Sequence, residues 1–213
     1  MLALTKIAYN QDVFFILLMI SFLIIAIIKG FYWRHATLFF MGVFAQRYAN
    51  QYLREDNAFT ERLSILTFFL MCINFTLIIV KTQAFIDVKK ISIVLCLVAL
   101  FFFLKIMVIK SLGILFKSID LSKLAIFFSM LFDKTLGFVL FPIVVFLYFF
   151  IYDISFLMLS IALGLSFFLL CIKLFWLWKI GTSSFGLSRF YIFLYLCMLE
   201  FFPILLIVKG SGY

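Results

Sequence analysis

Residues that interrupt helices are scarce in this sequence. Its 213 residues include only 2 prolines and 9 glycines, whereas the strands of a β-sandwich or soluble barrel need turn residues at short, regular intervals. The alternating pattern of a membrane β-barrel is also absent. The scarcity therefore excludes a β architecture and predicts an all-α fold.

Residues that carry chemistry are equally few. The chain has one histidine, and its 4 cysteines each stand alone in an apolar run, without a CxxC pair or a histidine at metal-ligand spacing. These cysteines are Cys72, Cys96, Cys171 and Cys197. A nucleophile elbow, a phosphate-binding loop and a carboxylate pair are absent too. We therefore expect no enzyme activity, no metal and no cofactor.

Hydrophobic residues, in contrast, make up 68% of the chain, and aromatic residues make up 21%. An ordinary soluble domain is only about 45–50% apolar, so no soluble fold could bury this much apolar surface. In hydrocarbon every backbone polar group must be paired inside the protein, and a helix does this within one segment. The composition predicts a single polytopic membrane domain over residues 1–213, with the lipid bilayer as its surroundings.

Six apolar runs are long enough to span a bilayer, provided that the short first run includes its neighbours. They are Val13–Ile28, Leu63–Val80, Ile91–Ile109, Gly137–Tyr152, Ile154–Leu177 and Tyr191–Val208. Pro142 should kink the fourth run, because proline removes a backbone donor and clashes with the preceding turn. The prediction is about six transmembrane helices, within a range of five to seven.

The basic residues indicate how the chain is oriented. The formal net charge is +9, but most lysines and arginines lie between the apolar runs, where they face headgroups rather than nucleic acid. Thirteen follow the first, third and fifth runs, and five lie on the other side. Because basic residues favour the cytoplasmic side, both termini are expected to be periplasmic.

Two of the connections on the cytoplasmic side have an amphipathic pattern. Between Phe44 and Glu55, apolar residues recur with a period close to 3.6, which predicts an amphipathic helix at the membrane surface. Its polar face consists of Arg47, Asn50, Gln51 and Arg54, and Glu55 follows directly. A second such stretch, Leu112–Phe132, predicts a second surface helix.

The polar face of the first amphipathic helix has two possible roles. It could bind lipid headgroups, for which charge is sufficient, or it could dock against another protein. Asn50 and Gln51 add directional hydrogen bonds, which favour a defined partner. We therefore prefer docking against another membrane protein.

Glu200 is the most unusual residue, because it lies midway along the last apolar run. An ionised acid at the centre of a spanning helix costs about 2.5–3.5 kcal/mol, so it needs a partner or a proton. Asn74 and Ser166 lie at a similar depth and are candidate partners. A structural hydrogen bond between helices is preferred to a proton relay, a cation site or a substrate contact.

The remaining polar residues have simpler interpretations. Lys105 and Lys173 lie near the inner ends of their runs, where long amines can extend to the headgroups. His35 is interpreted as an isolated histidine at the membrane interface.

Three motifs carry a resemblance to a known family. FAQRYANQYLREDN begins at Phe44, LFDKTLGFVLFP covers Leu131–Pro142, and FLYLCMLEFFP covers Phe193–Pro203. In this order and spacing the chain resembles a family of polytopic inner-membrane proteins, found mainly in Bacteroidota and classed as a domain of unknown function. The resemblance covers nearly the whole chain. It implies the inner membrane of a Gram-negative cell, but no established activity.

The sequence thus favours a non-enzymatic inner-membrane protein that serves as a small subunit or accessory factor of a larger assembly, such as an envelope secretion, motility or transport machine. The alternative is a small transporter or channel with Glu200 near its pathway. An enzyme that acts on lipid ranks last. No nucleic-acid partner is expected.

The orientation gives the first testable prediction. Reporter fusions after Ser122 and Ser184 should report a cytoplasmic location, and fusions after Gln83 and Tyr213 a periplasmic one, because basic connections remain in the cytoplasm. The opposite pattern, or termini on different sides of the membrane, would overturn the six-span arrangement.

Overall fold

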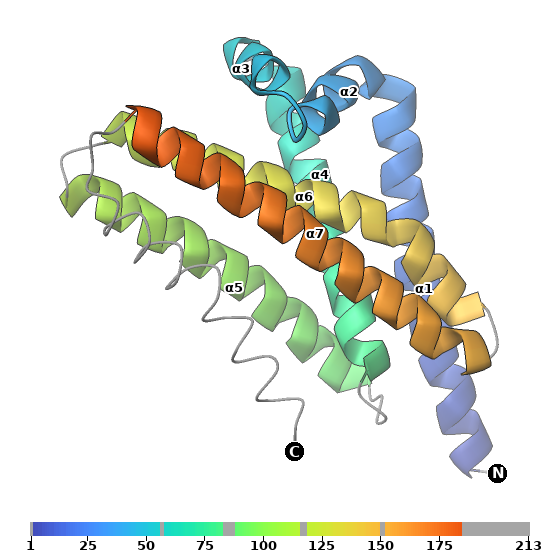
Figure 1. Cartoon of the computed structure of the whole chain (residues 1–213). Helices are drawn as coiled ribbons and strands as arrows, with labels where there is room; N and C mark the ends of the chain where they lie inside the picture. Colours follow the sequence, from blue (N-terminus) through green and yellow to red (C-terminus); the bar gives the residue numbers. More distant parts are fainter. Residues whose placement is uncertain (1, 56–57, 83–87, 116–118, 150–151, 185–213) are drawn as a thin grey trace. The chain divides into compact units, whose positions relative to one another are not determined.

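Every element that the structure describes is a helix (Figure 1). The computed structural model describes residues 2–55, 58–82, 88–115, 119–149 and 152–184. The helices are α1 (Leu2–Phe31), α2 (Trp33–Met41), α3 (Gln46–Arg54), α4 (Ala58–Thr82), α5 (Val88–Leu115), α6 (Ile119–Phe149) and α7 (Tyr152–Ser184). The all-α class predicted from the scarcity of turn residues is confirmed for these residues.

Four of the described helices contain a segment long and apolar enough to cross a membrane. These segments are Val13–Phe31, Ala58–Lys81, Val88–Ser111 and Ser122–Phe149. They overlap the first four predicted runs, and α7 contributes a shorter apolar segment, Ser160–Trp176, inside the fifth. The sixth predicted run, 191–208, lies outside the described residues.

The region predicted as a second surface helix has a different structure. Residues 112–115 form the end of α5, and residues 119–132 form the first part of α6, which continues through Pro142 to Phe149. The helix that contains the fourth apolar run therefore begins well before Gly137, the predicted first residue of that run. Between Ile119 and Phe141 the chain contains one glycine and no proline, and a glycine costs about 1 kcal/mol and does not end a helix.

The chain forms two compact units. The first contains Met1–Phe103 and Met130–Ser166, and the second contains Leu104–Ser129 and Phe167–Tyr213. Helices α5, α6 and α7 each contribute to both units. In the first unit α1 packs along α4, while α2 packs on α3 and also contacts α1 and α4. Figure 1 shows α2 and α3 together where α1 ends and α4 begins.

Aromatic contacts define the direction of α6 within the first unit. The ring of Phe14 near the start of α1 lies 5.0 Å from Tyr148 near the end of α6, and Phe22 lies 6.5 Å from Phe141. The Tyr148 hydroxyl also donates a 2.8 Å hydrogen bond to the Leu77 carbonyl near the end of α4. Helix α6 therefore runs in the same direction as α4 and opposite to α1.

Gly137 allows α4 and α6 to approach each other closely. A Cβ atom at this position would lie 2.6 Å from Met71 Cα and 2.7 Å from Met71 Cβ, distances that real Cβ atoms essentially never show. Small residues at such contacts let two membrane helices pack backbone to backbone. The glycine in the LFDKTLGFVLFP motif is thus required by packing.

The second unit contains buried lysines. Lys105 of α5 is 5% exposed and Lys173 of α7 is 2% exposed, so the prediction that both amines extend to the headgroups is wrong. The long aliphatic stems of these residues pack into the chain instead.

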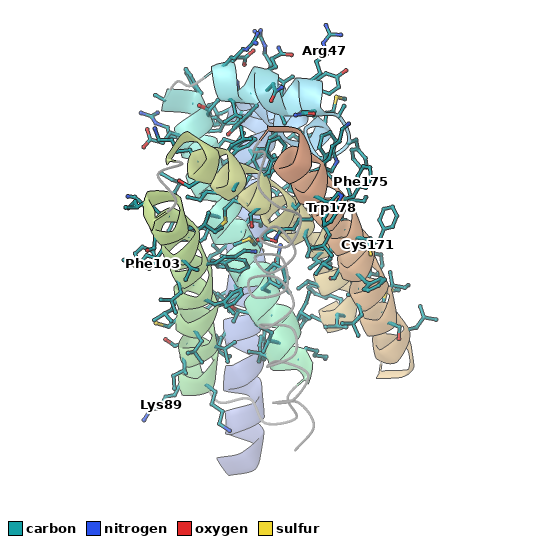
Figure 2. The ribbon with its side chains drawn as sticks, turned by 60° about the vertical axis from the view of Figure 1, so that its left-hand side comes forward. Arg47, Lys89, Phe103, Cys171, Phe175 and Trp178 are labelled. Atoms are coloured by element: carbon teal, nitrogen blue, oxygen red, sulfur yellow. The ribbon has the colours of Figure 1, made fainter. Side chains whose placement is uncertain are left out.

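On α7, Cys171, Phe175 and Trp178 follow i, i+4, i+7 spacing and are exposed, and Figure 2 shows them projecting from this helix.

The tight contact at Gly137 gives a second prediction, with a matched control. Gly137→Ala should lower the stability of the detergent-solubilised protein by about 1–3 kcal/mol, because the added methyl group overpacks the contact with Met71. Gly164→Ala is the control, since a Cβ at helical Gly164 meets nothing within 4 Å. Thermal unfolding measures both variants. Equal melting temperatures for the two would show that the α4–α6 contact is not this close.

Candidate functional site

Helix α3 packs onto the protein through its apolar side. Ala49 and Tyr52 are buried on this side. A Cβ at Gly42 would lie 3.3 Å from both Cα and Cβ of Ala49, so the turn before α3 passes close against the helix. The Tyr52 ring lies 5.3 Å from Phe39 of α2, and its hydroxyl donates a 3.0 Å hydrogen bond to the carbonyl of Thr60 in α4. Helices α2 and α4 therefore cover Ala49 and Tyr52, whereas the apolar residues Tyr48 and Leu53 of α3 are exposed.

The opposite side of α3 is exposed and polar. Arg47, Asn50, Gln51 and Arg54 are all exposed, and their i, i+3, i+4, i+7 spacing places them along one face. We call these four residues the α3 stripe. Figure 2 shows Arg47 at one end of the first unit and Lys89 at the other. The helix and its polar face agree with the sequence pattern, whereas the docking role remains a prediction.

Glu55, which follows α3, connects this helix to α2. Gln51 Nε2 donates a 3.2 Å hydrogen bond to Glu55 Oε1, and His35 Nδ1 lies 3.4 Å from Glu55 Oε2. The His35 ring also stacks on Phe59 of α4, with 6.0 Å between ring centroids. The Glu55 carboxylate thus accepts one hydrogen bond, from Gln51, while His35 Nδ1 lies beside it without forming one. The α3 stripe itself contains two arginines and no acid, so it carries a net positive charge.

The contacts of His35 were missed at the level of sequence. It was interpreted as an isolated interfacial residue, because Glu55 lies beyond two helix ends and no periodicity links the two positions. Only the fold of α2 against α3 brings them together.

Asn74 links three helices of the first unit. Its side chain is 0% exposed, its Nδ2 donates a 2.8 Å hydrogen bond to the Gly137 carbonyl, and its Oδ1 accepts a 3.4 Å hydrogen bond from Ser21 Oγ. Ser21 is itself 0% exposed. A carbonyl oxygen has two lone pairs, so that of Gly137 can accept from Asn74 in addition to its own helix.

Asn74 is buried, and its described contacts are with Ser21 and Gly137. Ser166, which together with Asn74 is predicted from the sequence as a partner of Glu200, donates a 2.7 Å hydrogen bond to the Ala162 carbonyl of its own helix. Glu200, the other residue of this predicted intramembrane set, lies outside the described residues. Ser21 was not identified from the sequence, because a lone serine in an apolar run gives no pattern.

Lys134 is a buried amine on α6. Its side chain is 8% exposed, and Nζ donates a 2.5 Å hydrogen bond to Ser64 Oγ of α4. It lies within the candidate span Ser122–Phe149, where an unpaired ammonium would cost several kcal/mol. The sequence predicts a connection at Lys134, because the predicted fourth run begins only at Gly137.

The described part of the chain contains no group of three or more His, Cys, Asp or Glu residues that could hold a metal ion. The polar groups that it does bring together are the α3 stripe at one end of the first unit, the Ser21–Asn74–Gly137 link, and the Lys134–Ser64 pair. The first can recognise a partner, the second joins helices, and the third presents hydrogen-bond donors.

These features define a class: throughout the described ranges the protein consists of long apolar helices, with a short polar helix packed across one end of a helical unit. The chain belongs to the family described as a domain of unknown function, DUF4271, whose model matches residues 14–210. Comparison with curated proteins and with solved structures gave no match.

The Asn74 link gives a third prediction, testable by a double-mutant cycle. Ser21→Ala should cost about 0.6 kcal/mol, the average for such bonds in membranes, and Asn74→Ala more, because it removes two bonds. The effects should not add, since both variants break the same Ser21–Asn74 bond. In the matched cycle, Ser166→Ala should add independently to Asn74→Ala. Thermal unfolding in detergent measures the stability of the wild type, the two single variants and the double variant of each cycle. A coupling energy between Asn74 and Ser166, with none between Asn74 and Ser21, would contradict this packing.

Proposed function

We propose that this chain is a non-enzymatic integral membrane protein that serves as a small subunit or accessory factor of a larger membrane assembly. The observation that carries the proposal is the α3 stripe. Arg47, Asn50, Gln51 and Arg54 are exposed together on a helix that the protein itself holds in place.

The packing of α3 favours a protein partner over headgroup binding. A helix that binds the membrane surface buries its apolar face among the lipids. Ala49 and Tyr52 of α3 are instead covered by Phe39, the Gly42 turn and the start of α4, although Tyr48 and Leu53 are exposed. Its exposed amides, Asn50 and Gln51, add directional bonds that a headgroup does not need.

The charge of the α3 stripe indicates the chemistry of its partner. Arg47 and Arg54 are seven residues apart, which is about 10 Å along the helix axis. The stripe itself contains no acid, and Glu55, which follows Arg54 in sequence, accepts a hydrogen bond from Gln51. The stripe therefore suits an acidic segment of another subunit, in which carboxylates receive charge-assisted hydrogen bonds from both guanidinium groups.

The apolar helices support a membrane location. Large apolar side chains such as Phe103 and Phe175 are exposed, and they project from their helices in Figure 2. Exposed apolar surface on this scale is unfavourable in water and favourable in lipid. Six spans, with the last at 191–208, remain part of the proposal.

The orientation is proposed from the basic residues. Three of the thirteen counted on the cytoplasmic side, Lys105, Lys134 and Lys173, are buried within helices. Without these three lysines, ten basic residues remain on the predicted cytoplasmic side and five on the predicted periplasmic side. This excess favours a cytoplasmic location for α3, periplasmic termini and, with the family resemblance, the inner membrane of a Gram-negative bacterium of the Bacteroidota.

A small transporter or channel is the second candidate function, favoured by one observation. Lys134 is an ionisable group buried inside a candidate span, and such groups commonly mark ion or substrate pathways. Glu200 would be the second ionisable group near such a pathway.

The docking function gives a fourth prediction. Arg47→Ala combined with Arg54→Ala should reduce recovery of partner proteins after purification in mild detergent by about tenfold or more, since each charge-assisted bond contributes roughly 1.5–3 kcal/mol. The yield and melting temperature of the variant should match the wild type, because both side chains are exposed.

A matched pair of lysines provides the control. Lys89→Ala combined with Lys90→Ala removes the same charge from exposed residues at the other end of the first unit, and it should retain the partners. Full retention of every companion by the arginine variant would contradict docking. A variant that loses no companion but loses transport in proteoliposomes would favour the second candidate.

A further inference from the structure

The ammonium group of Lys134 has fewer acceptors than it needs. An ammonium carries three N–H donors. Among the described residues, the bond to Ser64 Oγ is its one hydrogen bond, and no described carboxylate pairs with it. Two donors therefore remain on a side chain that is 8% exposed.

Ser64 adds a third donor at the same place. Its hydroxyl oxygen accepts the bond from Lys134 Nζ, so its own proton remains to be donated. The neighbouring hydroxyls are already used within their helices: Thr67 donates to the Leu63 carbonyl at 2.8 Å, and Thr135 donates to the Leu131 carbonyl at 2.8 Å. The contact between α4 and α6 thus presents positive charge and donors together.

We propose that Lys134 and Ser64 form a binding site for a phosphate oxyanion at the contact between α4 and α6. An anionic oxygen beside Nζ accepts from the two remaining N–H groups and from the Ser64 hydroxyl, and its charge balances that of the buried ammonium. This binding site is separate from the α3 stripe and does not depend on the proposed docking function.

The position of the site indicates how a phosphate reaches it. Ser64 lies two residues after Arg62, an exposed basic residue near the start of α4, which is about 3 Å along the helix axis. Because a basic side chain at the end of an apolar run extends to the headgroups, and the hydrocarbon core is about 30 Å thick, the binding site is closer to the surface than to the midplane. Phe40 of α2 lies 4.5 Å from Phe138 of α6, which places α2 about one turn from Lys134 along α6. The phosphate therefore comes from the α2–α3 end, either on a lipid headgroup or free in solution.

The test uses the full chain, purified in a maltoside detergent that contains no phosphate. Phosphatidylglycerol and inorganic phosphate are titrated separately, with chloride holding the ionic strength constant, and thermal unfolding is recorded. At a hundredfold excess over the dissociation constant, the ligand should raise the melting temperature by roughly 5–10 °C. A rise with the lipid alone identifies a headgroup, and a rise with inorganic phosphate as well identifies a free anion.

Three variants test whether the rise in melting temperature depends on Lys134 and Ser64. Lys134→Met should abolish the rise, and Lys89→Met, which removes an exposed lysine of the same unit, should retain it. Ser64→Ala keeps the charge and should shift the titration midpoint about tenfold, through loss of one charge-assisted bond. If Lys134→Met does not fold, Ser64→Ala alone still tests the binding site.

Two results would overturn the proposal. A rise that persists in Lys134→Met, or in Ser64→Ala with an unchanged midpoint, would place the phosphate elsewhere. No rise with either ligand in the wild type would mean that the amine is neutral or is paired with a carboxyl group of the chain itself.

Discussion

The first unit depends on the contact between α4 and α6 at Gly137. Inside a bilayer there is little hydrophobic driving force between helices, so close packing and hydrogen bonds must hold them together. Both occur here, since Met71 meets the bare backbone of Gly137 and Asn74 bonds to its carbonyl. Ser21 extends the same link to α1. The register of α1, α4 and α6 is therefore fixed in one place, near the middle of α4.

This register determines which residues meet at the two ends of the first unit. At one end Tyr148 contacts Phe14 and Leu77, and the Lys81 amine lies 5.1 Å from the centre of its ring. At the other end, Lys134 meets Ser64, and Phe138 contacts Phe40 of α2. Basic groups thus lie toward both ends of the paired helices, while the section between them contains neutral polar groups.

Sequence patterns predicted the elements better than their contacts. The α3 helix and its exposed Arg47 and Arg54 followed from periodicity. The contact of Asn74 with Ser21 did not, because a helix that is apolar on every side gives no pattern to show which side faces protein.

The errors have a common physical cause. A lysine near the end of an apolar run was interpreted as facing water or headgroups, yet Lys105 and Lys173 are buried and α6 begins well before Gly137. The aliphatic stem of lysine tolerates burial, so charge alone does not mark the end of a helix. Gly137 illustrates the opposite case, because its importance lies in the side chain that it lacks.

The packing of α3 also has a consequence for the entropy of recognition. A nine-residue helix alone in water would be largely unfolded, because too few turns follow the costly first one. Contacts through Ala49 and Tyr52 order its backbone when the protein folds. The backbone of α3 therefore loses its conformational entropy during folding and not during binding. A partner meets side chains that are already spaced for binding.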